Sequence, residues 1–294
     1  MEKINEQSLK KYTGLDALQA FSCDFFGMSA TNNPNTIAFA DTEKFIDQIN
    51  SNSNITVVIT NELLCGKLKD KVVILCEDPR YSYYQFSNGI GETNYITFPS
   101  QISPSAQIHH RAFVSEHNVI IGDNTIVGPN TSILADVEIG SDCVINSGVS
   151  LGNSGYEFKR TSKGILPVFH DGKVIIKNRV RVGANTAIDK GFSFRHTIIE
   201  DDVKIDDLVY IAHGGQIGEG TFLVGHVMIS GSTTVGKNVW VGPGAILSSS
   251  ITIGDHAFIS LGSIVNRNVG PGEHVTGNFA IEHKKFIENL KKNK

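Results

Sequence analysis

The sequence predicts a mainly β protein: a left-handed parallel β-helix of hexapeptide repeats, preceded by a small α/β domain and closed by a short C-terminal helix. Two observations support this prediction. An aliphatic residue returns at every sixth position from Ile199 to Val265, and two continuous apolar runs, at 55–60 and 71–76, precede the repeats. A period of six fits neither an α-helix nor simple strand alternation, so it indicates a solenoid.

Each hexad is expected to form a short strand and a turn, and three hexads close one triangular coil. The aliphatic side chain points into the coil, so stacked coils bury one continuous apolar column. Residues eighteen apart therefore lie directly above one another. The repeated positions are Ile199, Ile205, Ile211, Ile217, Leu223, Ile229, Val235, Val241, Leu247, Ile253, Ile259 and Val265.

Residues 1–100 lack the hexad pattern and predict the small α/β domain. Leu9–Phe21 has the apolar spacing of a helix, and 36–40 resembles a strand. Asp41-Thr42-Glu43 resembles a helix start that leads into 44–49. The apolar runs described above are typical of buried strands. An α/β domain of this kind can bind a ligand ahead of the solenoid.

The β-helix domain is predicted at 101–278, with its register interrupted at 152–172 and at 190–196. The first stretch has the Gly, Lys and Ser content of an excursion from the solenoid. Loops that leave a rigid scaffold commonly determine specificity. The alternative for either loop is a solvent-exposed insertion. Gly270-Pro271-Gly272 stops the register, and 279–294 predicts a short basic helix that caps the last coil.

Composition excludes several classes of protein. The chain has 294 residues, 40% of them apolar, and 29 are glycines, as a protein with many tight turns requires. The net charge of −4 and the lack of a long basic stretch give little support to a nucleic-acid groove. No apolar stretch is long enough to cross a bilayer. The four cysteines are scattered, which predicts reduced thiols in a cytoplasmic protein.

His213 is the candidate catalytic residue of the solenoid. It follows Ile211 and Ala212, two glycines follow it, and Asp206-Asp207 lies one strand earlier. A carboxylate can fix an imidazole tautomer and raise its basicity. The alternative is a surface histidine on a turn. Since flat-sided coils pack side by side, we expect a homotrimer with clefts between neighbouring chains, into which such a side chain projects.

The eighteen-residue spacing places Gly231 directly over His213, about 5 Å along the axis. A base beside an unencumbered backbone N–H suits acyl transfer: the base takes a proton from the nucleophile, and the N–H stabilises the oxyanion. His226 and His256 fall off this column, and no spacing among the three histidines suggests a metal site. We therefore expect a base without a metal.

Several runs resemble the UDP-3-O-acylglucosamine N-acyltransferases of lipid A synthesis, over nearly the whole chain. They are NTIAFADTEKF (Asn35–Phe45), GANTAIDKG (Gly183–Gly191), KIDDLVYIAH (Lys204–His213), ISGSTTVG (Ile229–Gly236) and VTGNFAIEHKKF (Val275–Phe286). The resemblance implies that His213 is the general base, that Asp206 supports it and that Gly231 supplies the oxyanion N–H. It also implies that Phe39 and Phe45 sandwich a uracil ring, which flat aromatic faces can do; ordinary core packing is the alternative.

The sequence departs from the family pattern at several of these positions. Ser250 stands where the family has a second active-site histidine, and Thr42 stands where an Asn usually lies between the uracil-stacking aromatics. Asp207 replaces an Asn. The segment containing Tyr156 and Phe158 keeps the aromatic pair of the family but adds a carboxylate between them, and the tail after the last helix is short.

The sequence thus predicts an N-acyltransferase that acts on the amino group of a UDP-linked amino sugar, for lipid A or a surface glycan. No tightly bound cofactor is expected, and the acyl donor is either an acyl-carrier-protein thioester or acyl-coenzyme A. Two alternatives stay open. One is an acetyl- or acyl-coenzyme A-dependent acetyltransferase of nucleotide amino sugars for O-antigen or capsule. The other is a non-catalytic nucleotide-sugar-binding scaffold.

Overall fold

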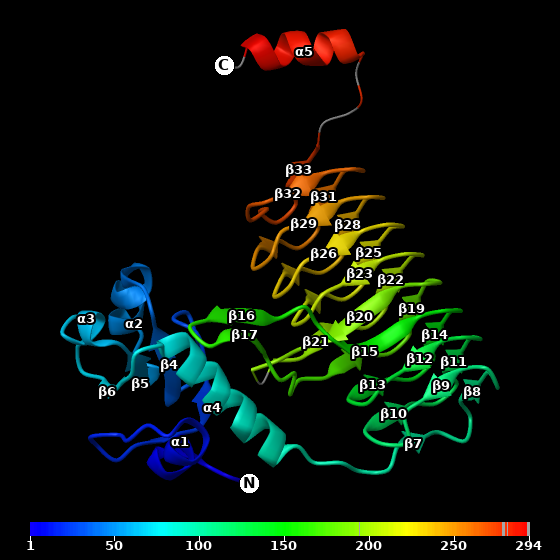
Figure 1. Ribbon diagram of the computed structural model, residues 1–294. Coiled ribbons are helices and arrows are strands. Elements are labelled where there is room, and N and C mark those ends of the chain that lie inside the picture. Colours follow the sequence, from blue (N-terminus) through cyan, green and yellow to red (C-terminus); the bar gives the residue numbers. More distant parts are fainter. Residues whose placement is uncertain (194, 278–279, 281, 293–294) are drawn as a thin grey trace. The chain divides into compact units, whose positions relative to one another are not determined.

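The computed structural model describes residues 1–193, 195–277, 280 and 282–292 (Figure 1). The chain divides into two compact units. Unit 1 comprises Met1–Pro99, Ser154–Lys173 and Lys190–His196, and unit 2 comprises Ser100–Asn153, Val174–Asp189 and Thr197–Lys294. Both excursions from the repeat register are therefore grouped with the N-terminal residues, whereas the sequence analysis places them in the β-helix domain.

Unit 1 is built on a four-stranded parallel sheet in the order β3-β4-β5-β6. Its strands are β3 (Phe25–Phe26), β4 (Thr36–Ala40), β5 (Ile55–Thr60) and β6 (Val72–Leu75), with a separate antiparallel pair β1 (Ile4–Asn5) and β2 (Ser22–Cys23). Its helices are α1 (Glu6–Thr13), η1 (Glu43–Phe45), α2 (Ile46–Ser51), α3 (Glu62–Cys65) and α4 (Pro79–Asn94). The strands at 36–40, 55–60 and 72–75 agree with the sequence prediction, because continuous apolar runs suit a sheet covered on both faces.

Two helices of unit 1 differ from the sequence-based expectation. The helix at Leu9–Phe21 begins at Glu6 and ends at Thr13, because Gly14 adopts φ +76 and its N–H donates to the Lys10 carbonyl. The long helix α4 was not predicted. Its signals were present: the Asp78 side chain caps the first turn, and Pro79 occupies the first helical position.

The excursion after residue 153 contains an antiparallel hairpin, β16 (Phe158–Thr161) and β17 (Gly164–Pro167). Hydrogen bonds hold it to α4. The Ser162 amide donates to the Asp78 carboxylate at 2.6 Å, and Asn88 donates to the Pro167 carbonyl at 2.8 Å. The hairpin is therefore a structured part of unit 1 rather than an irregular loop.

Unit 2 is the predicted left-handed parallel β-helix, and its strands form three parallel sheets (Figure 1). The first sheet contains β7 (Gln101–Ile102), β10 (Val119–Ile121), β13 (Val137–Ile139), β18 (Val174–Ile176), β21 (Thr197–Ile199), β24 (Gln216–Ile217), β27 (Thr234–Val235) and β30 (Thr252–Ile253). The second contains β8 (Gln107–Ile108), β11 (Ile126–Val127), β14 (Val144–Ile145), β19 (Arg181–Val182), β22 (Lys204–Ile205), β25 (Phe222–Leu223), β28 (Trp240–Val241), β31 (Phe258–Ile259) and β33 (His274–Val275). The third contains β9 (Phe113–Val114), β12 (Ser132–Ile133), β15 (Ser150–Ser154), β20 (Ala187–Lys190), β23 (Tyr210–Ile211), β26 (Met228–Ile229), β29 (Ile246–Leu247) and β32 (Ile264–Val265).

The inward aliphatic column is the core of unit 2. Ile211, Val241 and Leu247 are fully buried, and the two-residue strands from β11 to β32 each present one such aliphatic residue to the interior. Tyr210 pairs with Met228 and Ile211 with Ile229, so neighbouring strands of a sheet are eighteen residues apart where the register is uninterrupted. Stacking of the hexads thus follows from burial of one aliphatic side chain per repeat.

The C-terminal helix α5 spans His283–Lys292. Part of the segment predicted to cap the last coil, residues 279, 281, 293 and 294, lies outside the described residues. That the helix covers the coil stays a prediction. No helix in the described part of the chain is long and apolar enough to span a membrane.

Candidate active site

His213 and Gly231 occupy equivalent turns on successive coils of the β-helix. His213 follows β23 and Gly231 follows β26, and these strands pair in register. The Ser232 amide donates to the His213 carbonyl at 2.9 Å. The stacking predicted from the eighteen-residue spacing is therefore present in the backbone.

The imidazole of His213 lies against the Cα of Gly231. A Cβ added at Gly231 would fall 2.4 Å from Cε1 and 2.6 Å from Nε2 of His213. Real Cβ atoms do not approach ring atoms so closely, so any larger residue at 231 would displace the imidazole. Glycine is required here for close approach of a side chain to the backbone.

The amide of Gly231 is available as a donor. At six other turns a side chain accepts a hydrogen bond from the equivalent amide, that of the second residue after the inward aliphatic residue. The amides and their acceptors are Ser141 with Asn178, Asn178 with Asp201, Ala184 with Asp207, Gly225 with Asp206, Lys237 with Asp255 and Gly277 with Ser263. Among the hydrogen bonds of the described residues, none uses the amide of Gly231. An N–H beside a histidine ring and without an internal acceptor suits an oxyanion.

Ser250 lies in the turn one coil beyond Gly231. Its amide donates to the Gly231 carbonyl at 3.1 Å, and its side chain is exposed. The residue stacked on Gly231 at the eighteen-residue spacing is Ser249, because Ile229 pairs with Leu247. The structure therefore places Ser250 one residue beyond the column that carries His213 and Gly231.

Asp206 lies at a different turn from His213. It follows β22 of the second sheet, whereas His213 follows β23 of the third sheet. Its carboxylate accepts a hydrogen bond from the Gly225 amide at 3.1 Å, and Asp207 accepts one from the Ala184 amide at 2.5 Å. Within one chain both carboxylates thus bind backbone amides of neighbouring turns.

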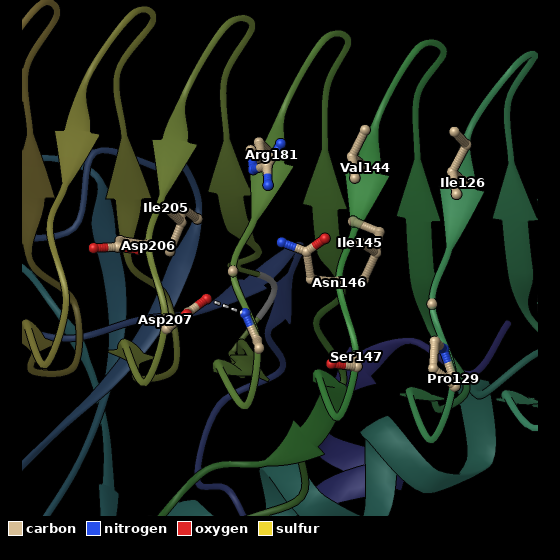
Figure 2. Close-up of a pocket in the computed structure, with 13 residues that line it drawn as sticks. Ile126, Pro129, Val144, Ile145, Asn146, Ser147, Arg181, Ile205, Asp206 and Asp207 are labelled. Atoms are coloured by element: carbon tan, nitrogen blue, oxygen red, sulfur yellow. Dashed lines mark hydrogen bonds between the residues drawn. The ribbon is translucent and has the colours of Figure 1, made fainter.

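A groove of about 490 Å³ crosses the second sheet and the turns that follow its strands (Figure 2). Its polar lining includes Asn146, Ser147, Arg181, Asp206 and Asp207. Figure 2 shows that these side chains come from consecutive coils and that Asp207 bonds the neighbouring turn. The groove places Asp206 on an accessible face of unit 2.

The predicted uracil-binding residues lie close in sequence at the end of β4. Phe39 is half-buried, with its ring centroid 4.8 Å from that of Tyr83 and 5.7 Å from that of Tyr84. Thr42 is exposed, and Phe45 is 38% exposed. Phe45 thus exposes part of its ring, with the Lys44 ammonium 5.3 Å from the ring centroid, while part of the Phe39 ring packs on the core.

The aromatic pair of the hairpin segment is the most exposed part of the candidate site. Tyr156 is 84% exposed and Phe158 is 50% exposed, and their ring centroids are 5.1 Å apart. The carboxylate between them, Glu157, pairs with Lys159, whose ammonium lies 4.7 Å from the centroid of the Tyr84 ring. Glu157 is therefore ion-paired in the structure with Lys159, whose side chain is largely buried.

The sequence analysis missed three polar residues next to the His213 turn, the buried Asp189 and Thr197 and the half-buried Tyr210. The Asp189 carboxylate accepts a hydrogen bond from the Tyr210 hydroxyl at 2.6 Å, and the Thr197 hydroxyl accepts one from the Gly214 amide at 2.9 Å. The sequence did contain a signal for Asp189. This carboxylate directly follows the inward residue Ile188, whereas the equivalent residues of the next two coils, Ala212 and Ser230, are small. No group of three or more His, Cys, Asp or Glu suited to a metal ion occurs in the described part of the chain.

Comparison with known proteins agrees with this architecture. The bacterial transferase hexapeptide family (six repeats) matches residues 118–153. A solved structure described as a UDP-N-acetylglucosamine acyltransferase from Campylobacter jejuni superposes with a TM-score of 0.50 at 19% identity, covering 65% of this chain and 82% of that one. This similarity shows the fold.

Two curated relatives are more similar in sequence. The UDP-3-O-acylglucosamine N-acyltransferase of Rickettsia massiliae (strain Mtu5) is 48% identical over 99 residues, which are 33% of this chain. The probable UDP-3-O-acylglucosamine N-acyltransferase 2, mitochondrial, of Arabidopsis thaliana is 46% identical over 104 residues, 35% of this chain. The matched segments span 28% and 34% of the length of these relatives. The resemblance found in the sequence is confirmed over about a third of the chain, where the protein is similar to the UDP-3-O-acylglucosamine N-acyltransferases, and the hexapeptide repeats match at residues 118–153.

Proposed function

We propose that the protein is an N-acyltransferase that moves an acyl group from a thioester to the amino group of a UDP-linked amino sugar, for lipid A or another surface glycan. The observation that carries this proposal is the contact of the His213 ring with Gly231, whose amide is not used by any described hydrogen bond. A base and an oxyanion donor on successive coils suit attack of an amine on an acyl carbonyl.

In the proposed reaction, His213 removes a proton from the sugar amine as its nitrogen attacks the thioester carbonyl. The carbonyl oxygen becomes an oxyanion and accepts a hydrogen bond from the Gly231 amide. The C–S bond then breaks, the amide forms, and the thiolate takes the proton that His213 holds. The step needs neither a metal nor a tightly bound cofactor, since the residues only move one proton and stabilise one charge.

We further propose that Asp206 supports the His213 of a neighbouring chain in a homotrimer. Within one chain, Asp206 and His213 follow strands of two different sheets, with β23 between them. A carboxylate on an accessible groove can meet a histidine of an adjacent protomer, so the site would be completed by assembly. In this arrangement the carboxylate stabilises the imidazolium formed during the reaction.

Mixed trimers test this arrangement. We expect Asp206→Asn and His213→Ala proteins to be inactive separately and to recover activity after joint refolding. About a quarter of the interfaces then combine an intact histidine with an intact aspartate from the other chain. If the pair acts within one chain, no mixed trimer regains activity. A refolded mixture of each variant with itself is the control.

Unit 1 is the proposed nucleotide-binding part. Phe45, with an exposed ring, and Phe39 at the end of β4 would hold the uracil, and Thr42 lies between them in sequence. The exposed pair Tyr156 and Phe158 would contact the substrate from the hairpin segment. Aromatic rings exposed on a structured hairpin suit a flat or apolar ligand.

The acyl donor is proposed to be a thioester of acyl carrier protein or of coenzyme A. Because Ser250, in the turn one coil beyond Gly231, stands in place of a second imidazole, a coenzyme A-dependent acetyltransferase of nucleotide amino sugars is the second candidate. Both donors and the UDP-sugar are cytoplasmic metabolites, so we propose that the protein acts in the cytoplasm. A non-catalytic nucleotide-sugar-binding scaffold is the third candidate.

A competition experiment separates these functions. Purified protein is given 3-hydroxyacyl-carrier protein and acetyl-coenzyme A together with a panel of UDP-amino sugars, and the products are identified by mass spectrometry. Formation of an N-acylated UDP-sugar supports the proposal, and the mass of the product identifies the donor. Binding of a UDP-sugar without product from any donor would indicate the scaffold.

A further inference from the structure

A buried threonine at one fixed position of the repeat ties successive coils together. It lies two residues before the inward aliphatic residue, and its hydroxyl donates to a carbonyl in the turn of the next coil. Three of these hydroxyls also accept a hydrogen bond from a backbone amide of that coil. They belong to Thr125, Thr186 and Thr221. The donating threonines and their acceptors are Thr125 to Gly140, Thr131 to Asn146, Thr186 to Asp206, Thr221 to Gly236 and Thr233 to Ser248.

Thr197 occupies the same position but makes different bonds. The pattern predicts that its hydroxyl donates to Ala212, fifteen residues ahead. Instead it donates to the Asp189 carbonyl at 2.6 Å and accepts from the Gly214 amide at 2.9 Å. Gly214 directly follows His213 and has a φ of +68. The departure from the pattern therefore falls on the turn that carries the candidate base.

Asp189 contacts Tyr210, at the start of the segment that carries His213. It lies level with Ala212 on the next coil, because Ile188 pairs with Ile211. Its side chain is only 6% exposed, and its carboxylate accepts a hydrogen bond from the Tyr210 hydroxyl at 2.6 Å. Burial raises the pKa of Asp189, and burial followed by the bond to this carboxylate raises the pKa of Tyr210. A carboxylate is kept here although burial disfavours its charge.

These bonds anchor the His213 segment at both ends. Tyr210 is held through the Asp189 carboxylate, and Gly214 is held through Thr197 to the Asp189 carbonyl. His213 lies between the two anchors and packs on Gly231. Since side-chain hydrogen bonds to the turn restrict its backbone, they fix the direction in which the imidazole leaves the coil.

We propose that Asp189, Thr197 and Tyr210 are positioning residues that hold His213 in register with the Gly231 amide. This inference rests on the proposed function, because the cost of misplacing His213 is measured as lost acyl transfer. The hydrogen bonds of these three side chains go to one another and to the backbone of the His213 segment. They act through the backbone on each side of the base, and a small displacement of a catalytic group costs a large factor in rate.

Thr197→Val tests the proposal, because valine keeps the shape of threonine and removes both hydrogen bonds. We expect kcat to fall by roughly ten- to a hundredfold while KM for the amino sugar stays within about twofold. Thr197→Ser keeps the hydroxyl and should restore kcat. The matched control is Thr221→Val, which removes the two ordinary bonds at the same repeat position. The melting temperature of Thr221→Val should fall by about as much as that of Thr197→Val, whereas its kcat should be unchanged.

Tyr210→Phe is the second variant, since it removes a single hydroxyl and keeps the ring. Hydrogen–deuterium exchange at 210–214 provides a readout that needs no substrate: both Thr197→Val and Tyr210→Phe should speed exchange there, and Thr221→Val should not. Unchanged kcat and unchanged exchange in both variants would overturn the positioning role. If the wild-type protein transfers no acyl group but both variants exchange faster than it does at 210–214, the proposed function is contradicted and the anchoring of the segment is supported.

Discussion

At the scale of single residues, the candidate site depends on one close approach of a ring to a backbone. The His213 imidazole occupies the space that a Cβ at position 231 would need. Gly231 does not have a positive φ, so its backbone conformation alone would tolerate another residue. The requirement for glycine comes from the histidine on the coil below, so the two positions are coupled sterically.

His213→Ala should lower the rate of acyl transfer by about a hundredfold or more, because general-base catalysis contributes at least that factor. The measurement is kcat with the acyl donor and the UDP-amino sugar that mass spectrometry identifies as substrates. Phe45→Ala, which changes a proposed substrate contact in unit 1, should raise KM more than it lowers kcat. A loss of only a few-fold for His213→Ala would mean that another group is the base.

Gly231→Ala should lower kcat by about a hundredfold, because the added methyl displaces the imidazole from the amide. It should also lower the melting temperature. In a His213→Ala background this loss of stability should disappear, since the ring that meets the methyl is gone. Gly270→Ala is the control, because a Cβ there meets nothing closer than 3.6 Å. Equal effects of Gly231→Ala in both backgrounds would show that the clash is with other atoms.

At the scale of elements, the two-residue strands of the solenoid leave each turn free to differ. The inward residues of β20 and β23 are equivalent, yet the residue after the first is the buried Asp189 and the residue after the second is Ala212. One coil can therefore carry a buried carboxylate without disturbing the aliphatic column. This explains how a uniform scaffold supports a local polar network.

The buried carboxylate of β20 predicts a pH dependence of stability. Burial raises the pKa of Asp189 in the folded state, so the folded protein binds this proton more tightly than the unfolded chain. Its contribution to stability is present below the unfolded pKa of about 4 and is lost as the pH rises through the raised folded value. Relative to Asp189→Asn, the wild-type protein should therefore lose stability as the pH rises from about 4 through the raised folded pKa. Thermal melts of both proteins over a series of rising pH values measure the difference; a constant difference would contradict the prediction.

At the scale of the whole molecule, the second sheet of unit 2 carries an exposed aromatic ladder. Phe222, Trp240 and Phe258 are 43%, 38% and 41% exposed, and successive ring centroids are 6.0 and 6.1 Å apart. Contiguous exposed apolar surface of this kind marks interaction sites. Because the ladder follows a flat sheet, we propose that it packs against a second copy of the chain in the homotrimer.

Trp240→Glu should dissociate this trimer, since a carboxylate in an apolar interface has no partner. Sedimentation velocity at micromolar protein measures the oligomeric state. Acyl transfer should fall with dissociation if a neighbouring chain supplies Asp206. Leu18→Glu, at a site in unit 1 that is 86% exposed, is the control and should leave the trimer intact. A monomeric wild-type protein would refute the trimer, and a trimeric Trp240→Glu protein would refute this interface.

The sequence by itself determined the β-helix and the His213–Gly231 column. Burial of one aliphatic side chain in each hexad fixes the coil, and a fixed coil converts a spacing of eighteen into contact. The strands of unit 1 were predictable for a similar reason, because their apolar runs are continuous. Helix α4 was missed although its capping residues were present, since its apolar positions are interrupted by polar ones.

Only the tertiary structure decided which polar groups surround the candidate base. The sequence pointed to Asp206 because it lies seven residues before His213, but the coil directs the two residues to different turns. Asp189 and Thr197, more distant in sequence, are instead hydrogen-bonded to the His213 segment. The physical reason is that the hexad period specifies which residues stack, whereas the partner of each hydroxyl and carboxylate depends on how each turn is filled.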